Sequence, residues 1–137
     1  MKTMFSFTGA IVVIISMCLL IPAVEAQVSD TLEVVAAAIS KDVVEREAVD
    51  VGNSFSNSVP RLFCFTKIVG ASQPTEVVHV WSYGDMERAR ISLAVNAATW
   101  RTYSSKVIQA HEIGSWRVDV LDTSGNLLET INFEITQ

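Results

Sequence analysis

The chain has 137 residues, of which 50% are hydrophobic and 18% are charged, and its formal net charge at pH 7 is −5. A chain of this length is expected to form one domain. The acidic balance argues against nucleic acid or an anionic membrane as the main partner.

The first 26 residues have the pattern of a secretory signal peptide. Lys2 supplies a positive charge, an apolar run covers residues 9–21, and Pro22 ends that run. The short segment that follows ends in V-E-A, which predicts cleavage between Ala26 and Gln27.

A retained membrane anchor is the alternative for this leader. Residues 4–23 would just reach across a bilayer of about 30 Å. If cleavage takes place, residues 27–137 remain as a single domain that is periplasmic or secreted and not inserted in a membrane. The leader itself would be a signal-peptide helix.

Cys64 is the single cysteine of residues 27–137. An exported domain with one cysteine has no internal disulfide. Cys64 lies in the apolar segment F-C-F, where burial raises the pKa of a thiol and blocks access to it. We therefore expect a small, reduced core residue rather than a nucleophile.

The segment from residue 27 to residue 58 gives weak signals. Asp30 followed by Glu33 resembles a helix capping box. Within residues 31–39, however, apolar residues at every second position from Leu32 would lie on one face of a strand, and the all-β context favours the strand. Residues 40–47 are charged and are expected to form an exposed connection or an edge, and residues 48–51 to resume extended structure. Residues 52–58 are expected to form a loop with Phe55 inserted into the core.

Four strands are predicted in the middle of the chain, at residues 60–68, 75–83, 88–95 and 100–108. The first is apolar on both parities, which is typical of a central strand covered on both faces. The next three are β-branched, aromatic or alternating, and Gly- or Asn-containing turns separate them.

Residues 114–135 form the clearest pattern, with two alternating runs around the turn D-T-S-G-N. This predicts a β-hairpin with one buried face, in which Gly125 takes a positive φ. Asp119 and Asp122 are expected to face water and to cap the turn. The predicted core anchors are Trp116, Phe63, Phe65 and Phe133.

Six to seven strands at spacings of about ten residues, with no confident helix, indicate an all-β domain. We expect an immunoglobulin-like antiparallel β-sandwich over residues 27–137, with one tryptophan, Trp81 or Trp116, buried between the sheets.

Five segments resemble a bacterial family of domains of unknown function, number 2914 of that series. In chain order they read R-E-A-V-D-V-G, R-L-F-C-F-T-K, H-V-W-S-Y-G-D, W-R-T-Y-S-S-K and G-S-W-R-V-D-V-L-D-T-S-G-N-L-L, and the resemblance covers residues 32–135. It implies a small all-β domain, often placed beside membrane or exported segments. It implies no established activity, so it assigns no catalytic residue.

No stretch carries a recognised catalytic or metal-binding pattern. The candidate ligands His79, Asp85, Glu87, His111 and Glu112 lack ligand spacing, and a zinc site needs three or four convergent donors. No G-x-S-x-G elbow is present, so acyl transfer has no anchor. We expect no cofactor, no metal and no enzymatic activity, although an envelope enzyme stays open as a third alternative.

The remaining candidates are aromatic and basic residues on the predicted strands. An exposed Trp100 or Tyr103 could stack on a sugar ring or a peptide. The candidate binding face consists of Arg88, Arg90, Arg101, Tyr103 and Lys106, unless cross-strand salt bridges neutralise these cations. We expect an exported, non-catalytic interaction module of the bacterial envelope that binds an envelope protein or a polyanionic component. The alternative is a carbohydrate- or peptide-binding domain.

Overall fold

The computed structural model describes residues 31–137, so the predicted signal peptide and its cleavage between Ala26 and Gln27 lie outside the described residues. The described chain is all-β. Its strands are β1 (Glu33–Val44), β2 (Glu47–Gly52), β3 (Ser54–Ser56), β4 (Arg61–Val69), β5 (Thr75–Tyr83), β6 (Met86–Val95), β7 (Thr99–Val107), β8 (Gly114–Leu121) and β9 (Leu127–Thr136).

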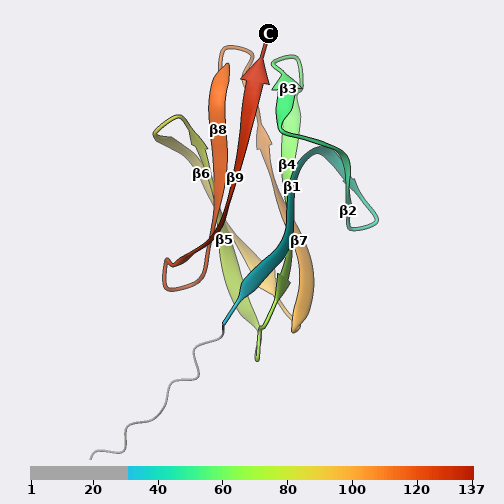
Figure 1. Ribbon diagram of the computed structural model, residues 1–137, viewed down its shortest axis with the longest axis vertical. Helices are drawn as coiled ribbons and strands as arrows, with labels where there is room; N and C mark the ends of the chain where they lie inside the picture. The colour runs from blue at the N-terminus through green and yellow to red at the C-terminus, as the bar shows by residue number, and fades with distance from the viewer. Residues whose placement is uncertain (1–30) are drawn as a thin grey trace, which may run out of the picture.

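The strands form two sheets that pack face to face (Figure 1). One sheet has the order β2-β1-β4-β7 and the other the order β3-β9-β8-β5-β6. All pairs are antiparallel except β3 with β9. From residue 31 onward there is no helix long and apolar enough to cross a membrane.

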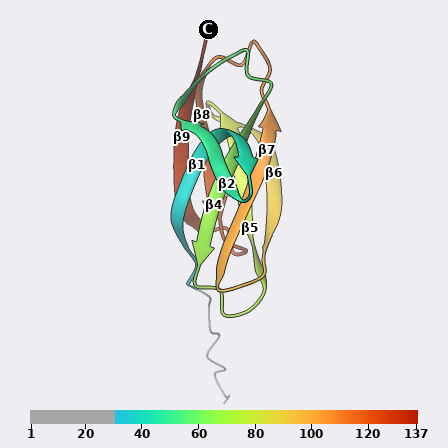
Figure 2. The same cartoon turned by 90° about the vertical axis from the view of Figure 1, so that its right-hand side faces the viewer.

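The strand content exceeds the prediction of six or seven strands. Residues 33–44 form one continuous strand, which decides between strand and helix there. Of the two alternatives expected at residues 40–47, an exposed connection or an edge, the connection is wrong. That segment instead forms a hairpin with β2, which leans out from the four-stranded sheet (Figures 1 and 2). Part of the predicted loop at residues 52–58 is the short strand β3, whose Phe55 is buried in the core as expected.

The core lies between the sheets in two clusters. The larger cluster contains Trp81 and Trp116, which both contact the ring of Phe133. The smaller cluster includes Ile68 and Val77. Both tryptophans are thus buried between the sheets, and the prediction of Trp116 and Phe133 as core residues is confirmed.

Phe63 is not a buried residue, and this corrects the prediction that it anchors the core, whereas Phe65 is buried as predicted but lies outside both clusters. Leu62 and Cys64 of β4 point between the sheets, so the intervening phenylalanines face outward by strand alternation. Phe63 is only half-buried and makes an edge contact with Tyr103. Phe65 is 6% exposed, but it is covered on the outer face.

The β8–β9 turn has the predicted chemistry. Gly125 has φ 82°, and one carboxylate oxygen of Asp122 accepts bonds from the backbone N–H groups of Ser124 and Asn126. The side-chain amide of Asn126 donates to the other oxygen, and these bonds lower the pKa of Asp122. Asp122 therefore caps the turn, as expected.

Candidate binding site at the edge of the four-stranded sheet

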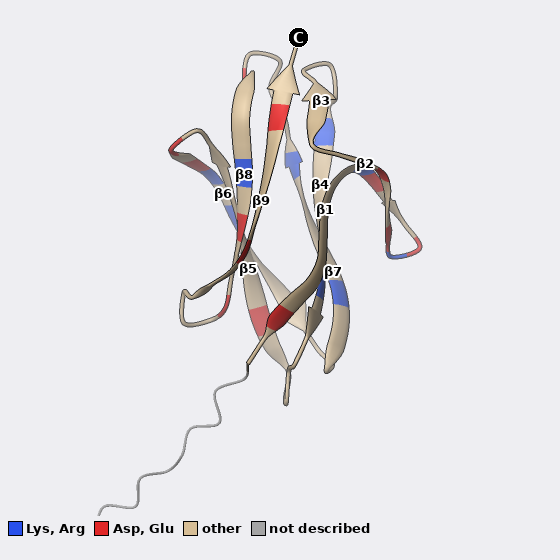
Figure 3. Cartoon of the chain, in the orientation of Figure 1, with Lys and Arg blue, Asp and Glu red and all other residues tan. Residues whose placement is uncertain are grey.

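The structure divides the predicted basic face into separate groups. Cations are spread over several strands of both sheets (Figure 3). Arg101 and Tyr103 share one hollow on β7, whereas Arg88 and Lys106 line another. Arg90 lines neither of these hollows and pairs with Glu87 on its own strand at 2.7 Å.

Arg88 is held in place by a buried carboxylate. Its Nε lies 3.3 Å from Oε2 of Glu112, whose side chain is only 3% exposed, and its guanidinium lies over the ring of Tyr83. The other carboxylate oxygen of Glu112 accepts the backbone N–H of Gln109. Removing one partner of such a pair leaves a buried charge uncompensated. Arg88 therefore stabilises the β7–β8 connection and is a poor candidate for ligand binding.

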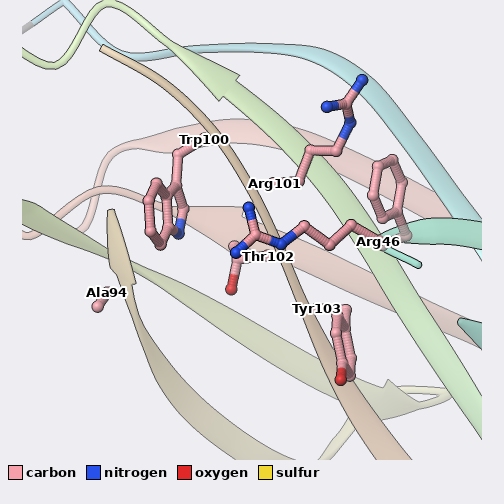
Figure 4. Close-up of a pocket in the computed structure, with 7 residues that line it drawn as sticks. Arg46, Ala94, Trp100, Arg101, Thr102 and Tyr103 are labelled. Carbon is pink, nitrogen blue, oxygen red and sulfur yellow. The ribbon is translucent and has the colours of Figure 1, made fainter. Parts of the chain in front are cut away.

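The hollow that contains Arg101 and Tyr103, which we call the β7 hollow, has a volume of about 230 Å³ and opens to solvent beside β7. Its walls are aromatic and cationic (Figure 4). It is lined by Arg46, Phe65, Ala94, Trp100, Arg101, Thr102 and Tyr103.

Arg46 reaches the β7 hollow from the tip of the β1–β2 hairpin. Its side chain passes between Arg101 and Tyr103, and its guanidinium lies 5.9 Å from the centre of the Trp100 ring (Figure 4). This distance suits a cation–π interaction. The hairpin thus brings a second arginine into the hollow that Arg101 lines.

The hairpin tip is strained. Glu45 and Arg46 have φ of 50° and 63° in a two-residue turn between the paired residues Val44 and Glu47. Such turns favour Asn and Gly, and other residues in this region cost of order 1–3 kcal/mol each. The strained turn directs the side chain of Arg46 toward β7, and backbone strain of this kind concentrates at binding sites.

The groups in the β7 hollow are accessible. Tyr103 is 47% exposed, and Trp100 is half-buried. Arg101 has an ion pair with Glu47 at 3.5 Å, but both side chains are largely exposed, so the pair is weak. An incoming acidic group can therefore replace Glu47 at Arg101 at little cost.

A different polar cluster lies sealed between the sheets. His79 is 0% exposed, because it shares a parity with Val77 and Trp81. Its Nδ1 lies 2.7 Å from Oγ of Ser104 and its Nε2 lies 3.2 Å from Oγ1 of Thr66.

The neighbours of His79 fix its tautomer. Trp81 Nε1 donates to Ser104 Oγ at 2.9 Å, and this leaves the hydrogen of the Ser104 hydroxyl free for donation to Nδ1. Thr66 Oγ1 donates to the carbonyl of Thr102, so it accepts from Nε2. This directional chain satisfies a neutral imidazole, and burial lowers the pKa of His79 to about 4. A serine and a histidine thus lie in hydrogen-bond contact, but both are buried, and the pair supports the fold.

Cys64 lies in the same interior and is 0% exposed. Burial raises the pKa of its thiol to about 12. The predicted burial is confirmed.

Cys64 in the native protein should therefore react with a thiol reagent far more slowly than in denaturant. The reaction can be followed by absorbance with an aromatic disulfide reagent, with free cysteine as the control for the intrinsic rate. Native labelling as fast as that in denaturant would contradict the expected protection.

The candidate metal ligands do not converge. Across residues 31–137, no group of three or more His, Cys, Asp or Glu side chains could hold a metal ion. Glu112 is engaged by Arg88, whereas His111 is exposed beside the hollow that contains Arg88 and Lys106.

Arg46 was not predicted as a binding residue, because it lies in the segment that was expected to form an exposed connection or an edge. The available signal was the pair of segments that flank E-R, with V-V before it and E-A-V after it. That pattern resembles a hairpin with a two-residue turn, but E-R is not a turn dipeptide, so the hairpin was not predicted.

The fold and the hollow define a small all-β domain of two packed sheets with an open aromatic and cationic hollow beside one edge strand. The family model described as "Protein of unknown function (DUF2914)" matches residues 74–135, which run from the start of β5 through most of β9. This match confirms the resemblance over residues 74–135. No curated protein matches the chain.

Proposed function

We propose that this domain is an exported, non-catalytic interaction module of the bacterial envelope that binds an acidic protein or a polyanionic component. The observation that carries the proposal is the position of Arg46 and Arg101 beside Trp100 and Tyr103 in an open hollow. Guanidinium groups form charge-assisted, bidentate bonds with carboxylates, and adjacent rings supply apolar contact area.

The distribution of the reactive side chains supports a binding role. His79, Ser104 and Cys64 are each less than 5% exposed, so a substrate does not reach them in this conformation. The accessible side chains are the cations and rings of the β7 hollow. The family carries no described activity that points elsewhere.

The second candidate is a carbohydrate- or peptide-binding domain in which aromatic stacking dominates. The exposure of Tyr103 and the partial exposure of Trp100 favour it. The two candidates differ in salt dependence, because stacking is insensitive to salt whereas exposed charge pairing is screened by it.

We infer further that the fold is an immunoglobulin-like sandwich. The chain crosses between the two sheets at β2–β3, β3–β4, β4–β5, β6–β7 and β7–β8, and Trp81 and Trp116 are buried between the sheets. Crossing connections and a buried tryptophan are typical of that architecture. Edge strands and connecting hairpins then carry the ligand contacts on a rigid scaffold.

The proposed function predicts salt-dependent binding of acidic polymers. We expect labelled polyglutamate and polygalacturonate to bind the protein at low salt, and the double variant Arg46→Glu with Arg101→Glu to weaken binding on the order of tenfold or more. Fluorescence anisotropy at low and high salt measures this.

A matched control carries the same change in charge elsewhere. The double variant Lys41→Glu with Arg90→Glu changes residues that do not line the β7 hollow. Arg46→Gly adds a second test, because glycine relieves the positive φ and should not destabilise the hairpin. Equal affinities in all variants, or an absence of binding to both polymers, would remove the β7 hollow from consideration.

A further inference from the structure

The strand β7 ends the four-stranded sheet, and within residues 31–137 no strand pairs with it on the side away from β4. Such an edge presents backbone groups that another chain can use. The β7 hollow lies at this edge, because Arg101, Thr102 and Tyr103 of β7 line it.

The register shows which backbone groups point away from β4. Hydrogen bonds from Ile108 N to Pro60 O and from Gly70 N to Ala98 O lie at the two ends of the β4–β7 ladder. They show that the pairs of even-numbered residues, such as Cys64 with Ser104, are the hydrogen-bonded ones. Hydrogen-bonded and non-bonded pairs alternate in an antiparallel ladder. Even-numbered residues of β7 therefore bond to β4, and odd-numbered residues, including Arg101 and Tyr103, direct their N–H and C=O groups to the free edge.

We propose that the β7 edge binds an extended acidic peptide segment by strand addition. The peptide backbone would bond to the N–H and C=O groups of Arg101 and Tyr103, and its acidic side chains would meet the guanidiniums of Arg46 and Arg101. Main-chain bonds of this kind provide affinity, and side-chain contacts provide specificity. The inference rests on the proposed function and names the ligand class.

The charges at this edge select the occupant. Arg46 and Arg101 line the β7 hollow. The ion pair of Arg101 is made with Glu47, an exposed residue of the same chain. A second copy of the same edge would bring two sets of cations together, which is unfavourable, and charged edge strands discourage such pairing. A strand with acidic side chains is complementary in both backbone and charge.

The alternation of a strand gives the peptide a definite pattern. Side chains at every second position of the added strand lie on one face of the sheet. Arg101 and Tyr103 share the outer face with Phe65, as their cross-strand pairing shows. Glutamates at alternate positions would therefore all lie on the face that Arg101 and Tyr103 share.

The test uses a short capped peptide in which glutamate alternates with threonine, and two derivatives. One derivative is N-methylated at every glutamate and the other at every threonine, so that each loses the backbone N–H donors of one parity. Only one parity faces β7 in an added strand. We expect one derivative to lose affinity on the order of tenfold or more and the other to bind like the parent.

Amide hydrogen exchange locates the contact on the protein. Binding of the parent peptide should slow exchange at Arg101 and Tyr103, whereas Thr102 and Ser104, which already bond to β4, serve as internal controls. Equal affinity of the parent and both derivatives, or unchanged exchange at Arg101 and Tyr103, would overturn strand addition. The proposed function survives that result if the Arg46→Glu and Arg101→Glu variant still loses polymer binding.

Peptide-dependent dimerisation, measured by light scattering, would show that a copy of the chain takes part and would also overturn the proposal. Failure of every acidic polymer and peptide to bind would instead remove the proposed function itself. The Arg46→Gly variant should keep the fold and weaken peptide binding, which separates loss of contact from loss of structure.

Discussion

Replacement of Trp116 by alanine is expected to lower the free energy of unfolding by about 3–5 kcal/mol. Trp116 is 2% exposed, stacks on Phe133 and donates its ring N–H to the carbonyl of Glu112. The variant removes the largest type of side chain from a packed interior and leaves that carbonyl without its donor. A loss of this size is a large part of the roughly 5–15 kcal/mol that stabilises a domain.

The neighbouring residue provides the matched control for this effect. The side chain of Arg117 is 39% exposed and pairs with Asp119 on the same strand. Arg117→Ala should therefore cost under about 1 kcal/mol. Urea unfolding followed by far-UV circular dichroism measures both, and equal losses would refute the assigned facing of β8.

Stability is expected to fall by about 3 kcal/mol as the pH decreases from about 6.5 to about 4, through the contribution of His79. Burial lowers the pKa of His79 to about 4, below the ordinary value of 6.5. Between these values the unfolded chain binds more protons than the folded chain. The contribution of His79 is thus fully present above about pH 6.5 and is lost as the pH falls through this range.

The hydrogen bonds give the physical reason. A protonated His79 would donate from both ring nitrogens, and Ser104 Oγ would then receive donors from both His79 and Trp81. The Ser104 hydroxyl would lose the acceptor that Nδ1 provides. Low pH therefore buries a charge and disrupts the directional chain between the sheets.

Urea unfolding at a series of pH values, compared between variants, measures the effect. His79→Gln removes the titrating group, so its stability should vary less with pH over this range than that of the native chain. His111→Gln, a change at an exposed histidine, should retain the native pH dependence. An unchanged pH dependence in His79→Gln would show that other groups produce it.

Much of the strand framework could be predicted because strand alternation is a local property. The patterns at residues 75–83, 88–95 and 114–135 lie within β5, β6 and β8–β9. The signal failed at residues 40–47, where charged residues occupy a strand that curves away from the sheet. It also failed to find Phe63 and Phe65 on the outer face, because a strand that is apolar on both parities does not show which face is the core.

The candidate site was predictable only in part. Arg101 and Tyr103 were predicted as members of one candidate binding face, and the structure places both in the β7 hollow. Arg88 was grouped with them, but its pairing with Glu112 depends on a loop that no local pattern describes. Arg46 was missed because its contact with Trp100 joins residues far apart in the chain.

The sequence by itself determined the all-β class, the β8–β9 hairpin with its Asp122 cap, and the burial of Cys64 and Trp116. These follow from alternation, turn chemistry and apolar neighbours, which act over a few residues. The tertiary structure alone decided that His79 meets Ser104 and Thr66, and that Arg46 meets Trp100. Both depend on which strands pair and how hairpins fold over sheets, and those choices are made by packing across the whole domain rather than by any one segment.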